Sequence, residues 1–185
     1  MRSLFLLYPA LIAHLFLCFP VFAGDKSINA QIAGATLVKE GQQAPDFSCV
    51  MLDGRSFEIS AQKGKVVLLY FFASSAPFSI TEMKYLESEV FQKLREREDF
   101  VMLGIGRGHQ RDEVVKIGGE NKLTFPLVQD TKEEIYRSYF SKFVPRTVVV
   151  RRDGTIAILS HGYKEYEGIV KLQAALEKEL SAKGR

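Results

Sequence analysis

The stretch KVVLLYFFASSAPFSITEM, residues 65–83, joins an apolar run to the start of a helix through a short turn. Residues 66–72 are continuously apolar and rich in β-branched and aromatic side chains, which is typical of a central strand buried on both faces. Small residues follow, and Pro77 fits the first turn of a helix, where no backbone N–H is needed. The stretch therefore predicts a buried strand that leads directly into a helix over residues 78–96.

Shorter patterns on both sides of this segment predict the other elements. Phe47, Cys49 and Met51 share one face of a strand that ends at Asp53-Gly54, a pair typical of hairpin turns. We expect further strands over 100–105, 124–128, 147–151 and 155–160, helices over 112–121, 131–139 and 165–180, and a turn over 106–109. Thr131 is the expected cap of its helix. This alternation of strands and helices predicts an α/β domain with helices on both faces of a central sheet.

Length and composition restrict the class of protein. The chain has 185 residues, of which 46% are hydrophobic and 25% charged, enough for one domain with a substantial core. The net charge of +3 is spread over many residues of both signs. No long basic block is present, so we expect no nucleic-acid partner.

The N-terminus has the pattern of a secretory signal. An apolar segment over residues 4–21 follows Arg2 and ends at Val21-Phe22-Ala23, a small-x-small cleavage pattern. We therefore expect a signal peptide over 1–23, a leader over 24–43 with a short edge strand around 32–38, and the main domain over 44–182. The protein would then lie in the periplasm or cell envelope. The alternative is that the segment stays uncleaved as a membrane anchor, the one case in which we expect contact with a membrane.

The central segment resembles the TlpA-like redoxins of the AhpC/TSA type, a family of thioredoxin-fold proteins of the bacterial envelope. These proteins typically read FWATWCPPCREEM here, and Phe71, Ala73, Pro77, Glu82 and Met83 match that pattern. The resemblance extends to three other segments, APDF (44–47), LDG (52–54) and VPRTVVVRRDG (144–154). It implies a thioredoxin-like three-layer sandwich with a mixed central sheet.

The redox cysteines of the family are absent from this sequence. Ala76 and Ser79 stand where the resemblance places them. A cysteine at a helix N-terminus is activated because the helix dipole stabilises its thiolate, whereas alanine and serine cannot form a disulfide. If the signal is cleaved, Cys49 is the one cysteine left, and an oxidoreductase or peroxidase-type role would require Cys49 or a cysteine of a partner. Its place on an apolar strand face favours a buried, structural thiol.

Two other chemistries find little support. Ser75 or Ser79 could act as a nucleophile with His109 as base, because all three are expected at the same sheet edge. However, the sequence has no GxSxG motif, and no acid is evident to orient His109. His109 and His161 without a cluster of cysteines or carboxylates do not indicate a metal site. We expect neither a metal nor a cofactor.

Binding of an extended peptide is the function that the resemblance leaves open. In thioredoxin-like proteins the residue before a cis proline presents its backbone to a peptide, and Val144-Pro145 resembles that position. An ordinary trans proline at a strand entrance is the alternative. Pro77 and Phe78 at the helix start, and Phe143 before the proline, are expected to border the same edge. The partner would be a peptide or an envelope protein.

A small anionic ligand is the second binding hypothesis. The free N–H groups at the start of the helix favour negative charge, and Ser75 and Ser79 would add hydroxyl donors. Arg107 and Arg146 could hold a carboxylate, and protonated His109 would strengthen the site at low pH. The alternative is that both arginines are solvated and point elsewhere.

Overall fold

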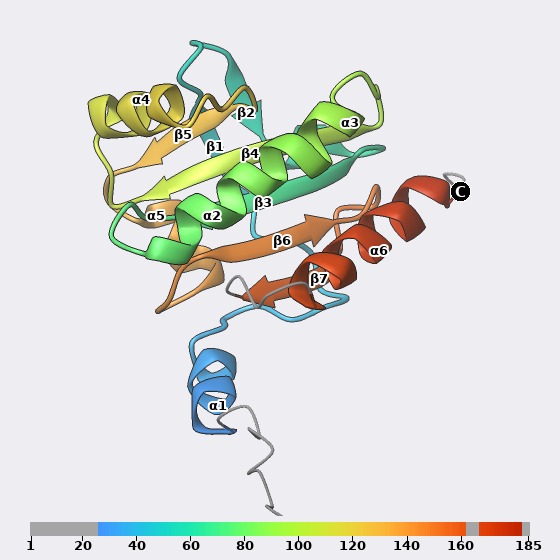
Figure 1. Ribbon diagram of the computed structural model, residues 1–185. Coiled ribbons are helices and arrows are strands. Elements are labelled where there is room, and N and C mark those ends of the chain that lie inside the picture. Colours follow the sequence, from blue (N-terminus) through green and yellow to red (C-terminus); the bar gives the residue numbers. More distant parts are fainter. Residues whose placement is uncertain (1–25, 162–166, 183–185) are drawn as a thin grey trace, which may run out of the picture.

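A mixed five-stranded sheet forms the centre of the computed structural model, which describes residues 26–161 and 167–182 (Figure 1). The predicted signal peptide lies outside the described residues. The strand order is β5-β4-β3-β6-β7. The strands are β3 (Val66–Phe72), β4 (Phe100–Arg107), β5 (Leu127–Asp130), β6 (Arg146–Val150) and β7 (Ile156–His161). Strands β3, β4 and β5 are parallel, and β6 and β7 join antiparallel.

The central strand β3 is completely buried, as its composition predicts. Successive side chains of a strand point to opposite faces, so Val66, Leu68, Tyr70 and Phe72 enter one apolar core and the residues between them enter the other. Helices α2 (Pro77–Tyr85), α4 (Arg111–Glu120) and α6 (Glu167–Ser181) cover the first face. Helix α5 (Glu134–Tyr139) and the hairpin β1 (Ser48–Val50) and β2 (Ser56–Glu58) cover the second. The predicted three-layer α/β sandwich is confirmed (Figure 1).

The long helix after the central turn is not uniform. It continues from α2 through a π-helical segment, Leu86–Phe91, and ends with the short α3, Gln92–Leu94. Glu87 lies in the π-helical segment, and its carboxylate accepts hydrogen bonds from the backbone N–H groups of Thr124 (2.8 Å) and Phe125 (3.3 Å). The predicted helix is thus present, with a local change of winding that the apolar spacing did not indicate.

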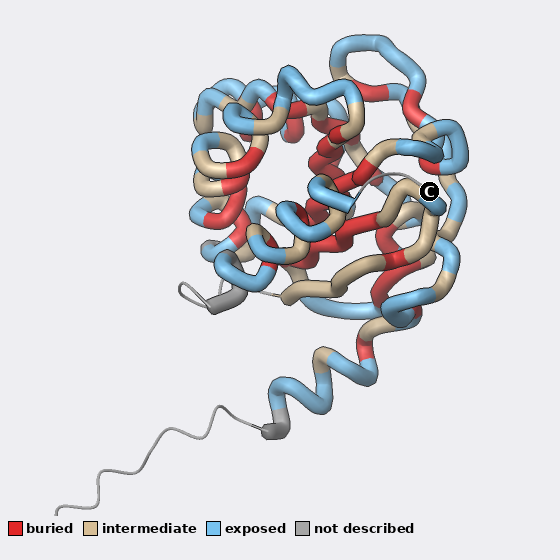
Figure 2. Tube along the Cα trace, turned by 90° about the vertical axis from the view of Figure 1, so that its right-hand side faces the viewer, coloured by how far each residue is buried: buried red, intermediate tan, exposed pale blue. Residues whose placement is uncertain are grey.

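The predictions for the edge strand of the leader, for the start of the turn after β4 and for the cap of α5 are wrong. The leader forms a helix, α1 (Lys26–Gly34), and two isolated bridges, Thr36 to Phe140 and Gln43 to Thr155, replace the expected edge strand. A short alternation of apolar residues does not distinguish a helix from a strand. Helix α1 extends away from the domain, and its described side chains are mostly exposed (Figure 2).

Strand β4 runs through the expected turn as far as Arg107. Thr131 does not cap α5, which begins at Glu134 and follows a left-handed Glu133 (φ 58°). The buried Asp130 carboxylate takes the role of the cap, because it accepts hydrogen bonds from the N–H groups of Ile135 (3.3 Å) and Tyr136 (2.8 Å).

Candidate functional site

The candidate site lies where β3 ends and β6 begins. Phe71 pairs with Arg146 in the antiparallel β3–β6 register. Continuing that register places Pro145 beside Phe72 and Val144 beside the turn that leads into α2. The Val144–Pro145 bond is cis, as predicted. The name site edge is used here for three segments together: the turn 73–76, the first turn of α2 and the loop 143–145. The turn and the start of α2 lie next to the loop before β6 in Figure 1.

The first turn of α2 carries one exposed and one buried side chain. Ala76 is the extended N-cap residue and makes no side-chain cap, and Pro77 occupies the predicted position. The Phe78 ring is 60% exposed, whereas Ser79 is completely buried. The Ser79 hydroxyl oxygen accepts a long hydrogen bond from the Ala73 N–H (3.5 Å). The expectation of an outward-facing Ser79 hydroxyl is therefore wrong, because this position of the helix faces the sheet; Ser75 is exposed.

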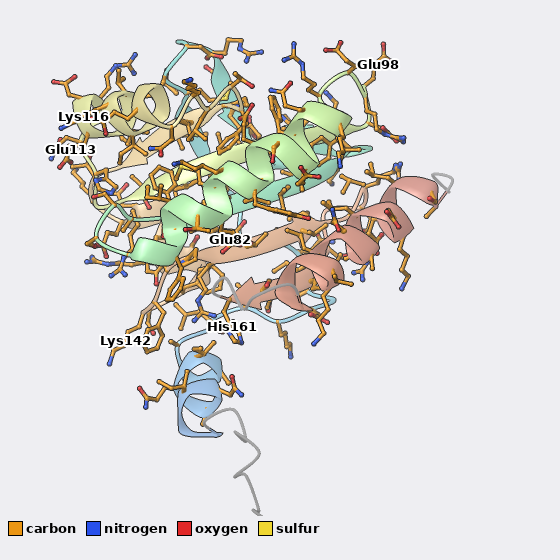
Figure 3. The ribbon with its side chains drawn as sticks, in the orientation of Figure 1. Glu82, Glu98, Glu113, Lys116, Lys142 and His161 are labelled. Carbon is orange, nitrogen blue, oxygen red and sulfur yellow. The ribbon has the colours of Figure 1, made fainter. Side chains whose placement is uncertain are left out.

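A buried carboxyl group, Glu82, lies one helical turn below Ser79. It extends from α2 toward β6 (Figure 3), and its Oε1 accepts a hydrogen bond from the Thr147 hydroxyl (3.1 Å). Its Oε2 has no hydrogen-bond partner among the described residues. Burial raises the pKa of Glu82 to about 7, although the bond from Thr147 opposes that shift. The nearby Tyr70 hydroxyl donates to the Ser79 carbonyl (2.7 Å). Sequence reasoning named Glu82 only as a match to the family pattern and gave it no role at the site, although its position three residues after Ser79 places it on the same face of the helix.

His109, in the loop between β4 and α4, contacts the turn 73–76 of the site edge. The imidazole is buried and stacks on Phe72 with ring centroids 6.0 Å apart. Its Nε2 accepts a hydrogen bond from the Ser74 N–H (3.0 Å), and its Nδ1 lies 3.4 Å from a carboxylate oxygen of Glu113. The prediction that no acid orients His109 is therefore wrong. The imidazole holds the turn and is not free to bind a ligand in the arrangement seen here.

Gly106 is what allows this close approach. A Cβ atom there would lie 2.8 Å from a methyl group of Val114 and 3.3 Å from the Phe72 ring. It would also lie 3.4 Å from the Cβ of His109. A side chain at this position would push apart β4, α4 and the histidine that contacts the turn.

Arg107 and Arg146 do not supply free guanidinium groups to the turn. Arg107 lies over the Tyr136 ring, 4.2 Å from its centroid, and pairs with Glu133 at 3.4 Å. Arg146 is only 2% exposed and faces the core on the side of α5. Its guanidinium lies 4.7 Å from the centre of the Phe140 ring. The predicted set of anion-binding side chains is not assembled, because both arginines lie on the sheet face opposite α2.

Arg146 instead holds the start of the described chain against the domain. Its Nη2 donates to the carbonyl oxygens of Ile32 and Lys142, both at 3.3 Å, and its Nη1 donates to the Thr36 hydroxyl (3.4 Å). Burial lowers its pKa. The role of Arg146 is thus to join α1 to the loop before the cis proline, which was not foreseen.

Tyr136 fixes the shape of that loop. Its hydroxyl donates a hydrogen bond to the Phe143 carbonyl (2.7 Å). Phe143 has a left-handed backbone (φ 70°), which is uncommon for a residue other than glycine. Its ring is 38% exposed, and the loop that follows contains the cis bond. The backbone before Val144 is thereby held in position, as a backbone that pairs with a peptide must be.

Cys49 and His161 lie away from the turn that His109 contacts. Cys49 is half-buried on β1, on the other face of the sheet, and burial together with the charge of Asp130 raises its pKa to about 11. His161 ends β7 and pairs with Arg146 at the start of β6, so it lies near the loop 143–145, whereas β6 and β3 separate it from β4, which precedes His109 (Figure 3). Within residues 26–161 and 167–182, no group of three or more His, Cys, Asp or Glu side chains is arranged to hold a metal. No helix in the same ranges has the length and apolarity needed to cross a bilayer.

Comparison with known proteins gives a consistent result. The sequence profile of the AhpC/TSA family matches residues 40–158. The chain is 27% identical over 134 residues to thiol-disulfide oxidoreductase ResA of Geobacillus thermodenitrificans, covering 72% of this chain and 76% of the relative. It is 30% identical over 120 residues to the thioredoxin-like protein YneN of Bacillus subtilis, covering 64% and 69%.

A solution structure from Bacteroides thetaiotaomicron, provisionally named a protein disulfide isomerase, superposes with a TM-score of 0.76. That protein is 29% identical to this chain, and the match covers 80% of this chain and 94% of the other. The agreement of sequence and structure comparisons supports the thioredoxin-like fold.

Proposed function

The chain belongs to the AhpC/TSA family, and from that premise we propose that it is a non-redox binding module for an extended peptide. The observation that carries the proposal is the exposure of the Phe78 and Phe143 rings on the two sides of the site edge, beside a loop backbone that the Tyr136 hydroxyl holds in position. An exposed backbone provides the hydrogen bonds of peptide recognition, and apolar side chains provide specificity. The exposed Phe78 and Phe143 rings offer such apolar contacts without a thiol.

Redox chemistry is the alternative that the names of the relatives suggest. Several of these relatives are thiol-disulfide oxidoreductases, but the resemblance aligns Ala76 and Ser79 with the cysteines that such chemistry needs. Cys49 is a poor substitute, since a thiol with a pKa of about 11 is almost entirely protonated at neutral pH. Reduction of insulin disulfides, measured with the wild type and with Cys49→Ala, separates the two functions. We expect no reduction by either protein.

The predicted signal over residues 1–23 would bring this module to the periplasm or cell envelope. Its partner would then be an exported or envelope protein with an extended segment. A free anionic ligand is the less favoured partner, since Arg107 and Arg146 are already engaged inside the domain.

Selection from a displayed peptide library tests the proposal directly. The purified protein should enrich peptides that bind it, and Phe78→Ser should weaken their binding by about tenfold or more, as expected for the loss of a buried aromatic contact. Val115→Ser is the matched control, because Val115 is also exposed (51%) but lies on α4. The absence of any enriched peptide, or equal loss in Phe78→Ser and Val115→Ser, would reject the peptide-binding role.

A further inference from the structure

The hydrogen bond between His109 and the turn before α2 joins two segments that are 35 residues apart. The donor is the Ser74 N–H and the acceptor is Nε2 of the imidazole, so this nitrogen must be unprotonated for the bond to exist. With His109 only 8% exposed, the ring is held by its neighbours rather than by solvent. The bond therefore fixes the position of the turn and depends on the protonation state of the histidine.

The surroundings of the imidazole define what happens when it gains a proton. Glu113 of α4 faces Nδ1 at 3.4 Å, and its carboxylate also accepts the Gln110 N–H (2.7 Å). From β3 the ring meets Phe72, which does not titrate. From the β5–α5 turn, the Thr131 hydroxyl donates to the His109 carbonyl (2.8 Å) and leaves the ring nitrogens untouched.

One more carboxylate lies near this loop. Glu133 contacts the position of Gly108, but it is paired with Arg107 and Arg137. Glu113 is thus the carboxylate seen in contact with the imidazole. Protonation would keep the histidine attached to Glu113, as an ion pair, while its bond to Ser74 is lost.

We propose that His109 is a positioning residue of the site edge, which holds the Ser74 amide, and with it the turn before α2, only while its imidazole is neutral. When Nε2 is protonated, two N–H groups face each other across 3.0 Å and the turn must move away. Residues 74–76 lead directly into Pro77 and Phe78, so release of the turn would disturb the ligand-facing surface. The expected effect on peptide binding rests on the proposed peptide-binding function. The turn itself can be followed without any ligand.

The test is an NMR titration of the purified protein between about pH 5 and 8, the range in which histidines change charge. The Ser74 amide proton should shift upfield as the pH falls, with the same midpoint as the His109 ring signals. In His109→Gln, which keeps an acceptor but cannot titrate, the Ser74 signal should not respond. In Glu113→Gln, which keeps an oxygen for the Gln110 N–H, the Ser74 signal should still follow the His109 ring signals. His161→Gln is the matched control and should behave as the wild type.

The outcomes separate this proposal from the proposed function. A Ser74 signal that stays constant while His109 titrates, or that shifts equally in His109→Gln, would overturn the positioning role whether or not peptides bind. If selected peptides bind, their affinity should fall at low pH in the wild type and in Glu82→Gln, but not in His109→Gln. Including Glu82→Gln removes the buried carboxyl group of the edge, whose pKa burial raises to about 7.

Discussion

The buried carboxyl group of Glu82 should make the wild-type domain less stable as the pH rises. Folding raises its pKa from the ordinary value of 4.5 to about 7, chiefly because the group is taken out of water. Between these two values the folded state keeps a proton that the unfolded chain has released. The stabilisation is therefore complete below pH 4.5 and is lost as the pH rises through about 7.

The size of the effect follows from the same two pKa values. One pKa unit corresponds to about 1.4 kcal/mol, so the full difference between acid and alkaline conditions is about 3 kcal/mol. Between pH 5 and pH 8 the linkage relation gives a loss of about 2.5 kcal/mol in the free energy of unfolding. That is a large part of the total stability of a domain of this kind. Glu82→Gln removes the titrating group and keeps an oxygen for the Thr147 hydroxyl. The variant should therefore not lose this stability as the pH rises.

Urea unfolding followed by far-UV circular dichroism measures the difference, since the chain has no tryptophan for fluorescence. The free energy of unfolding of Glu82→Gln relative to the wild type should rise by about 2.5 kcal/mol from pH 5 to pH 8. Other titrating groups cancel in this comparison. Glu98→Gln is the matched control, because Glu98 is exposed on a loop (Figure 3), and it should follow the wild type. Parallel pH profiles for the wild type and Glu82→Gln would refute the reasoning.

Three further changes test other parts of the structure. In a Cys49→Ala background, the double variant Ala76→Cys with Ser79→Cys should form a disulfide that titrates with a thiol redox buffer, because positions three apart at a helix start are neighbours. Each single cysteine variant is the control. A pair of cysteines that stays reduced would contradict the family geometry. Native Cys49 should resist alkylation at pH 8 and react only on unfolding, as its raised pKa and partial burial require; rapid labelling of the folded protein would show an accessible thiolate. Tyr136→Phe should lower the free energy of unfolding by about 1 kcal/mol and should broaden or shift the NMR signals of the loop 143–145. Tyr139→Phe should leave those signals unchanged, because the Tyr139 hydroxyl bonds to the Pro45 carbonyl.

The sequence by itself determined the elements whose signals are local. The continuous apolar run of 66–72, the small-residue turn and Pro77 specify a strand, a turn and a helix start within a few residues of one another, and the structure confirms all three. The cis bond at Val144–Pro145 was also predictable, through the resemblance, because the surrounding motif is short and contiguous. The same holds for the order of strands and helices, which restricts the topology to a thioredoxin-like sheet.

Only the tertiary structure decided which polar side chains serve the site edge. The bond from Ser74 to His109 spans 35 residues, and that from Arg146 to Ile32 spans 114. Whether an arginine near the end of a strand reaches the ligand side or the opposite face depends on strand register, and a single position changes the face. The burial of Glu82 depends in the same way on α2 packing against β6. Such partners are set by long-range packing, which no local pattern of residue types records.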